Sequence, residues 1–397
     1  MTSPPPPAPS SPAHSVGSHD RFAKAHSLRD AALAVLLGVG ALAWVMLPGD
    51  AVVESPSFGG PAILTPGGEL EVVARVSVPW VTAIDGLALA SGTRRVPLSL
   101  LRPPTRGARQ TILARVPSEC PPGNYDVVVR AGSREARAHR SVAVLESLPE
   151  RFTMAQITDL HFGYTAAGEA SVEAIVDELN RLQPTLVLVT GDIAHNGARR
   201  EYDRAQLALE RLSMPFVCIP GNHDRRGWGA YLTRFGFPYR SVAFGRWTLL
   251  GLDCGHGRDE FTESQFRFIE RALGAAEPGR VIVLAHIPLA GKRSVKAHAG
   301  AVMELFERKR VPLVVSGHWH YGAEYDPGAP APGRAQGGTQ FVVTVTAGGW
   351  LVKKPSGQPD PRGFTTIAVE DGRILSVTTH TVDSVGAPKS GARVDKP

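Results

Sequence analysis

The pattern of hydrophobic and polar positions changes near Pro149, and the two parts of the chain predict different kinds of fold. From about residue 56 to residue 148, short β-branched segments alternate with Gly/Pro turns at a spacing of about eight to twelve residues. This pattern predicts a small β-sandwich of immunoglobulin-like type over residues 52–148. After Pro149, runs of Val, Ile and Leu alternate with amphipathic stretches of helical length, which predicts an α/β fold.

The α/β part is expected to span residues 150–380, followed by a flexible tail over 381–397. Its apolar runs predict buried strands at Phe152–Ile157, Thr185–Thr190, Phe216–Ile219, Trp247–Leu252, Val281–Ala285 and Leu313–Ser316. Helices are expected between these strands, near 168–182, 201–212, 262–273 and 299–309. Two later segments, Phe341–Ala347 and Thr365–Glu370, are expected to close the sheets as antiparallel strands. Because the strands are apolar throughout, both faces of each sheet should be covered.

The N-terminal region suggests a route out of the cytoplasm. Residues 1–30 begin with a Pro/Ser-rich stretch and are expected to form a disordered leader. Ala31–Leu47 is an uncharged apolar run of 17 residues, close to the roughly 20 that span a bilayer as a helix. Three basic residues precede it, at Arg21, Lys24 and Arg29.

This charge distribution predicts a transmembrane anchor over residues 31–49, with the leader in the cytoplasm and the catalytic domain outside. Two alternatives stay open. The run could belong to a signal peptide, and cleavage would then release a secreted protein. It could also be a buried helix of a soluble domain.

Composition excludes some functions and leaves others open. The formal net charge is +6, from 43 Lys and Arg against 37 Asp and Glu. The arginines are spread along the chain without a basic run or interleaved aromatic residues, so no nucleic-acid-binding surface is indicated. The three cysteines are dispersed, and no disulfide framework is indicated. The sequence does not indicate an oligomeric state.

Residues that commonly bind metals follow the predicted strands in five clusters. The clusters are Asp159-Leu160-His161, Gly191-Asp192, Gly221-Asn222-His223-Asp224, His286, and Gly317-His318-Trp319-His320. Each cluster alone has an ordinary structural explanation, such as a turn, a helix cap or a buried core histidine. All five together, each at the end of an apolar strand, predict a site for two divalent cations.

The geometry of the clusters suggests how they act. Along an extended strand exit, Asp159 and His161 would point the same way and could reach one ion. Asp192 offers two carboxylate oxygens and is the natural bridge between two ions. Gly221 and Gly317 are expected to open sharp bends toward the site.

Taken as a set, the five clusters resemble the signature of the calcineurin-like metallophosphoesterases, over roughly residues 150–370. A weaker resemblance, in Gly191–Gly197 and Glu201-Tyr202, is to the class III cyclic-nucleotide phosphodiesterase-like branch. The family resemblance implies a four-layer αββα core with two divalent ions, such as Mn, Fe or Zn, at the strand ends.

The resemblance also implies a role for each residue. Asp159, His161 and His320 would hold the first ion, Asn222, His286 and His318 the second, and Asp192 would bridge them. His223 would be a catalytic residue, and Asp224 would orient it. An imidazole at this position could donate a proton to a leaving group at neutral pH.

The function predicted from these residues is hydrolysis of phosphate esters, with phosphodiesters favoured, by attack of a hydroxide that bridges the two ions. His195 and Arg225 are candidate substrate contacts, and the substrate would be a phosphorylated small molecule or a lipid-linked phosphate. The membrane would be a further partner through the N-terminal segment. Two alternatives stay open: a phosphomonoesterase or pyrophosphatase of the same fold, and a catalytically silent protein whose β-sandwich binds a partner.

Overall fold

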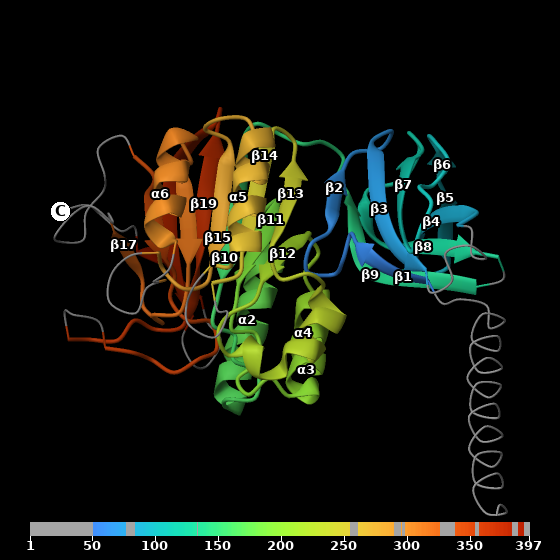
Figure 1. Ribbon diagram of the computed structural model, residues 1–397. Coiled ribbons are helices and arrows are strands. Elements are labelled where there is room, and N and C mark those ends of the chain that lie inside the picture. Colours follow the sequence, from blue (N-terminus) through green and yellow to red (C-terminus); the bar gives the residue numbers. More distant parts are fainter. Residues whose placement is uncertain are drawn as a thin grey trace, which may run out of the picture.

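The computed structural model describes most of the chain after the N-terminal segment. The described residues are 51–76, 84–132, 134–254, 261–289, 295, 298–325, 338–353, 357–382 and 388–392. Within them, two β-sheets precede a larger α/β part (Figure 1).

The N-terminal part is a sandwich of two sheets, in which alternate side chains of the strands point inward. One sheet has the order β1 (Ala51–Ser55), β3 (Glu69–Val76), β7 (Arg109–Arg115), β6 (Ser99–Leu100). The other has the order β2 (Ala62–Leu64), β9 (Arg134–Val144), β8 (Gly123–Ala131), β4 (Gly86–Ser91), β5 (Arg94–Pro97). Buried residues such as Val72, Ile112 and Val127 form one core between the sheets. The immunoglobulin-like type expected for this part stays a prediction.

The α/β part contains two six-stranded mixed sheets that pack against each other. The first has the order β12 (Phe216–Ile219), β11 (Leu186–Thr190), β10 (Phe152–Ile157), β19 (Gly363–Glu370), β20 (Arg373–Val382), β21 (Pro388–Ala392). The second has the order β13 (Arg240–Phe244), β14 (Trp247–Leu252), β15 (Val281–Ala285), β16 (Leu313–Ser316), β18 (Gln340–Val343), β17 (Ala323–Tyr325). Strand β21 lies within the tail that was expected to be flexible, where it pairs with β20.

Helices cover the outer face of each sheet. On the first sheet lie α2 (Ala166–Leu182), α3 (Arg199–Glu210) and α4 (Trp228–Phe235), and on the second lie α5 (Glu263–Ala275) and α6 (Ala299–Arg308) (Figure 1). A separate apolar core, which includes Leu188 and Leu284, fills the space between the two sheets. The predicted α/β class is therefore confirmed, and the layers run helix, sheet, sheet, helix.

The β-sandwich is fastened to the α/β part by the short loop between β1 and β2. Phe58 is only 4% exposed and packs among the residues that α2, α3 and α4 bury against the first sheet. Its ring lies 4.9 Å from that of Phe216 in β12, edge to face. The carbonyl of the next residue, Gly59, accepts a 2.7 Å hydrogen bond from the backbone N–H of Cys218, also in β12. The sandwich thus contacts the strand that leads to the Gly221–Asp224 cluster.

We expect Phe58→Ala to destabilise the full chain by about 3–5 kcal/mol, because it removes a buried aromatic ring and leaves a cavity. Phe237→Ala is the matched control, since that ring is 60% exposed and should change stability by less than about 0.5 kcal/mol. Urea unfolding of the two variants measures the difference. Equal effects would show that the Phe58 contact does not stabilise the fold.

A second contact joins strand β9 to the end of helix α3. The guanidinium of Arg140 donates to the backbone carbonyls of Glu210 and Leu212. The neighbouring His139 lies between two carboxylates, 3.1 Å from Asp126 and 2.8 Å from Glu210. The hydrogen bond to Asp126 is the main reason why the pKa of His139 is raised above its usual value.

This contact should make stability depend on pH. Because the folded-state pKa of His139 is raised, its stabilisation is fully present below the unfolded value of about 6.5 and is lost as pH rises through the folded value. We expect the free energy of unfolding to fall, as pH rises above about 6.5, by more in the wild type than in His139→Gln. Parallel pH dependence of the two proteins would contradict this assignment.

The expected membrane anchor is corrected by the structure. In the part of the chain that the structure describes, no helix is long and apolar enough to cross a membrane. The leader and the segment 31–49 lie outside the described residues. The prediction of a membrane-anchored protein with an external catalytic domain is therefore withdrawn.

Candidate metal centre

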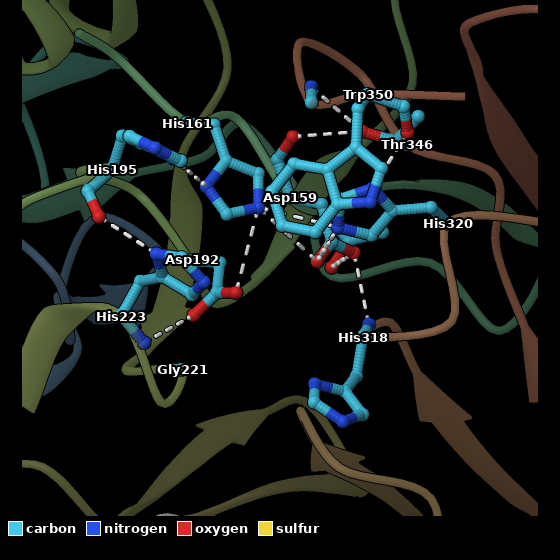
Figure 2. Close-up of polar contacts among 12 residues, drawn as sticks. Asp159, His161, Asp192, His195, Gly221, His223, His318, His320, Thr346 and Trp350 are labelled. Atoms are coloured by element: carbon cyan, nitrogen blue, oxygen red, sulfur yellow. Dashed lines mark hydrogen bonds and ion pairs between the residues drawn. The ribbon is translucent and has the colours of Figure 1, made fainter. Parts of the chain in front are cut away.

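The five predicted clusters converge at the ends of five strands. Strands β10, β11, β12, β15 and β16 end immediately before them, and parallel pairing within each sheet brings the carboxyl ends of neighbouring strands together. Figure 2 shows side chains from four of the clusters pointing toward one another. The sequence-predicted ligands are therefore neighbours in space.

The strand exits are not extended, in contrast to the expectation for Asp159 and His161. Five candidate ligands have a positive φ of 46° to 68°, a region that non-glycine residues rarely adopt. They are Asp159, His161, Asp192, His318 and His320. Ten non-glycine residues with positive φ occur in the described part of the chain, so half of them are in this centre. Strained backbone of this kind is concentrated at functional sites.

Asp159, His161 and His320 form the first group of candidate ligands, and all three are buried. The Nε2 atoms of His161 and His320 lie 3.2 Å apart. Oδ1 of Asp159 lies 3.1 Å from Nε2 of His320 and 3.9 Å from Nε2 of His161.

The second group contains Asp192, His286 and His318. Nε2 of His286 lies 3.3 Å from Oδ2 of Asp192 and 3.2 Å from Oδ1 of Asn222. The same Oδ2 atom lies 3.5 Å from Nε2 of His161, in the first group. Asp192 is thus the carboxylate that both groups share.

In two of the candidate ligand rings, a hydrogen bond to a backbone carbonyl determines which ring nitrogen carries the hydrogen. The Nδ1 atoms of His286 and His320 lie 2.7 Å from the carbonyls of Thr190 and Trp350, respectively. A carbonyl can only accept, so each Nδ1 donates and each neutral ring presents an Nε2 lone pair to the centre. This is how metal-binding histidines are held in many proteins.

The centre consequently gathers acceptors that need a cation. Oδ1 of Asp159 is buried and accepts no hydrogen bond of good geometry. Burial alone would raise the pKa of Asp192, but the adjacent His286 holds it well below its usual range. Burial acts to lower the pKa of His286, yet Asp192 raises it to about 9. A proton on His286 therefore competes with a divalent cation for the same carboxylate, and the donor set suits such a cation.

Two of the predicted bends require glycine because of close approach. A Cβ atom at Gly221 would lie 2.2 Å from Oδ1 of Asp192, and one at Gly317 would lie 2.0 Å from Oγ1 of Thr158. Neither glycine has a positive φ. Any side chain there would displace a candidate ligand or its neighbour.

The hydrogen bonds of the Asp224 carboxylate hold two loops together and do not include the ring of His223. The carboxylate accepts hydrogen bonds from the backbone N–H groups of Ile193, Ala194 and Gly221. The expected role of orienting His223 belongs to a different atom, because Nδ1 of His223 lies 2.6 Å from the carbonyl of His195. Asp224 acts on His223 only through the shared loop.

The two candidate substrate contacts differ in their surroundings. His195 is half-buried, and its Nδ1 lies 3.3 Å from Nδ1 of His161. Arg225 forms an ion pair with Asp253, and its guanidinium lies 3.7 Å from the centre of the Trp228 ring. The structure therefore brings His195 to the metal centre and places Arg225 in a separate ionic contact.

Sequence reasoning missed Trp350. Its half-buried ring lies 4.2 Å from that of His320 and 4.9 Å from that of His161 (Figure 2). The available signal was Gly348-Gly349 directly before it, which repeats the pattern of glycine after an apolar strand. A Cβ at Gly349 would come within 2.6 Å of the same two histidine rings.

Comparisons with known proteins agree with this geometry. A family model described as "Calcineurin-like phosphoesterase" matches residues 152–322. A "Probable cyclic nucleotide phosphodiesterase" of Rhodopseudomonas palustris is 30% identical over 191 residues, which are 41% of this chain and 70% of that protein. A "Transmembrane protein with metallophosphoesterase domain" of Danio rerio is 28% identical over 207 residues, which are 45% of this chain but only 43% of that protein.

The fold also matches a solved structure beyond the family region. Purple acid phosphatase PPD1 from yellow lupin (Lupinus luteus) superimposes with a TM-score of 0.52 at 16% identity, over 88% of this chain and 73% of that one. The chain belongs to the calcineurin-like phosphoesterases. The predictions of this family, of its cyclic-nucleotide phosphodiesterase-like branch and of a metal-dependent hydrolase are confirmed.

We expect Gly221→Ala to weaken Mn²⁺ binding by at least tenfold, because the new methyl group would displace Asp192 from its present position. Gly229→Ala is the matched control, since a Cβ there meets nothing within 4 Å. Isothermal titration of both variants with Mn²⁺ measures the effect. Wild-type affinity in Gly221→Ala would show that the close approach at Gly221 does not constrain the centre.

Proposed function

We propose that this protein hydrolyses phosphodiesters with the help of two divalent cations. The observation that carries the proposal is the convergence of buried acceptors, in which carboxylate oxygens and imidazole nitrogens face one another and the donor hydrogens of His286 and His320 point away from the centre. Burying such a set costs free energy unless positive charge compensates it.

Each group of ligands would hold one cation. Asp159, His161 and His320 would bind the first, and Asn222, His286 and His318 the second, with Asp192 bridging. Mn, Fe and Zn suit these donors. Two bound cations would lower the pKa of a coordinated water and stabilise negative charge on the phosphoryl oxygens.

His223 is the proposed proton donor to the leaving oxygen. The carbonyl of His195 fixes its Nδ1, so its Nε2 is the nitrogen available to a substrate. The ring is half-buried beside His161, with a centroid distance of 4.6 Å. A residue in this position is within reach of both the centre and solvent.

The substrate would enter over a rim that contains His195, Tyr164 and Trp350. Tyr164 is 39% exposed, and its ring lies 5.7 Å from that of Trp350. Arg226 is exposed, and its guanidinium lies 3.3 Å from the carbonyl of His195. Because Arg225 is already paired with Asp253, Arg226 is the better-placed cation for an anionic substrate.

The preference for diesters rests on the relatives, several of which are named as phosphodiesterases. A monoesterase or pyrophosphatase of the same fold is the alternative within this class. Comparing bis-p-nitrophenyl phosphate with p-nitrophenyl phosphate and with inorganic pyrophosphate separates the three activities.

We expect the purified full chain to hydrolyse the diester with Mn²⁺ and to lose activity in EDTA. Asp192→Asn should reduce kcat at least a thousandfold, since it removes the shared carboxylate. His223→Asn should reduce kcat less, by about 10²–10⁴-fold, the usual contribution of a general acid. Chelator-resistant turnover, or wild-type kcat in Asp192→Asn, would refute the two-cation proposal.

The same assay tests the alternative of a catalytically silent protein. If the wild type binds Mn²⁺ but hydrolyses none of the three substrates, the β-sandwich becomes the functional part and the metal centre a structural one. Activity that depends on metal and on Asp192 excludes this reading.

A further inference from the structure

His195 stands at the junction of the two loops that carry the first ligands. The loops after β10 and β11 pair through backbone hydrogen bonds: the N–H of His161 donates to the carbonyl of Asp192 at 2.9 Å, and the N–H of His195 donates to that of Phe162, also at 2.9 Å. This pairing places the side chain of His195 beside that of His161. The position of His195 is therefore set by backbone that the metal centre already uses.

A buried carboxylate also holds the loop around His195 in place. Glu201 is 2% exposed, and its Oε2 accepts from the backbone N–H groups of Asn196 and Ala198. Its Oε1 accepts from the side-chain amide of Asn196. The segment that follows His195 is thus anchored by three hydrogen bonds to one carboxylate, two from Asn196 and one from Ala198, which limits how far His195 can move.

The side chains of His195 and His161 meet at their Nδ1 atoms, 3.3 Å apart. Nε2 of His161 is the atom that faces His320 and Asp192. A ring that binds a cation through Nε2 carries its hydrogen on Nδ1, and that hydrogen needs an acceptor. In this structure Nδ1 of His195 is the atom in position to accept it.

The backbone of the same residue acts on the proposed proton donor. The carbonyl of His195 accepts from Nδ1 of His223, and the two rings stack with a centroid distance of 5.1 Å and an angle of 29°. One residue therefore contacts a candidate ligand through its side chain and the candidate acid through its main chain.

We propose that His195 is a positioning residue, which holds His161 in the tautomer that binds the first cation and links that ring to His223. This inference rests on the proposed two-cation function and replaces the direct substrate contact expected for His195. Its side chain would raise the basicity and fix the orientation of His161, as carboxylates and carbonyls do behind other metal-bound histidines.

Two nearly isosteric variants separate positioning from substrate contact. In His195→Asn the amide group occupies the place of Nδ1 and can accept from His161, but nothing replaces Nε2. In His195→Gln the amide lies near the place of Nε2, and the atom facing His161 is lost. His195→Leu removes both functions at similar volume.

The variants are made in the full chain and titrated with Mn²⁺ by calorimetry, and kcat and KM for bis-p-nitrophenyl phosphate are measured in parallel. We expect His195→Leu and His195→Gln to weaken binding of one Mn²⁺ ion by about 10–100-fold, the usual effect of losing such a partner. His195→Asn should stay within a few fold of the wild type in affinity and in kcat.

Wild-type Mn²⁺ affinity in His195→Leu would overturn the inference. So would rescue by Gln together with a raised KM in His195→Asn, since that pattern indicates substrate contact. The calorimetric result is independent of turnover. If the wild type binds Mn²⁺ but hydrolyses no ester, the proposed function is refuted. The Mn²⁺ affinities of the variants still test the role of His195.

Discussion

A cluster of buried hydrogen-bond acceptors is the constraint on which the rest of this structure depends. Asp159, Asp192, His286 and His320 are almost fully removed from water, and their carboxylate oxygens and imidazole nitrogens face a shared space. Such a cluster is tolerable only where positive charge can bind. Three features described above keep these acceptors in place. They are the left-handed backbone of the candidate ligands, the close approach at Gly221 and Gly317, and the backbone carbonyls that accept from the Nδ1 atoms of the histidine rings.

Much of the centre could be predicted from the sequence because its signals are local. An apolar run that ends in Asp, Asn or His identifies both the strand and the candidate ligand, as at Val281–Ala285 and His286. The order of the clusters then restricts the chemistry. Parallel pairing makes strand ends neighbours without any knowledge of side-chain contacts.

What could not be predicted depends on contacts between distant residues or on backbone angles. The carbonyl that fixes His223 belongs to His195, on another loop, and Asp224 serves backbone N–H groups of that loop. The left-handed angles at Asp159 and His161 have no signature in a sequence that reads as an extended strand exit. Helix α4 is absent from the helices expected from the sequence, although its Tyr231 and Phe235 are buried.

The contact between the β-sandwich and the α/β part has a consequence for how the chain folds. Strands β12 and β13 are the terminal strands of their sheets, and the β1–β2 loop and strand β2 lie against them. An uncovered sheet edge can pair with another chain and begin aggregation. The sandwich precedes the α/β part in the sequence, so during synthesis it emerges first and can cover both edges as they form. The β-sandwich would thus reduce pairing of these edges with other chains during folding.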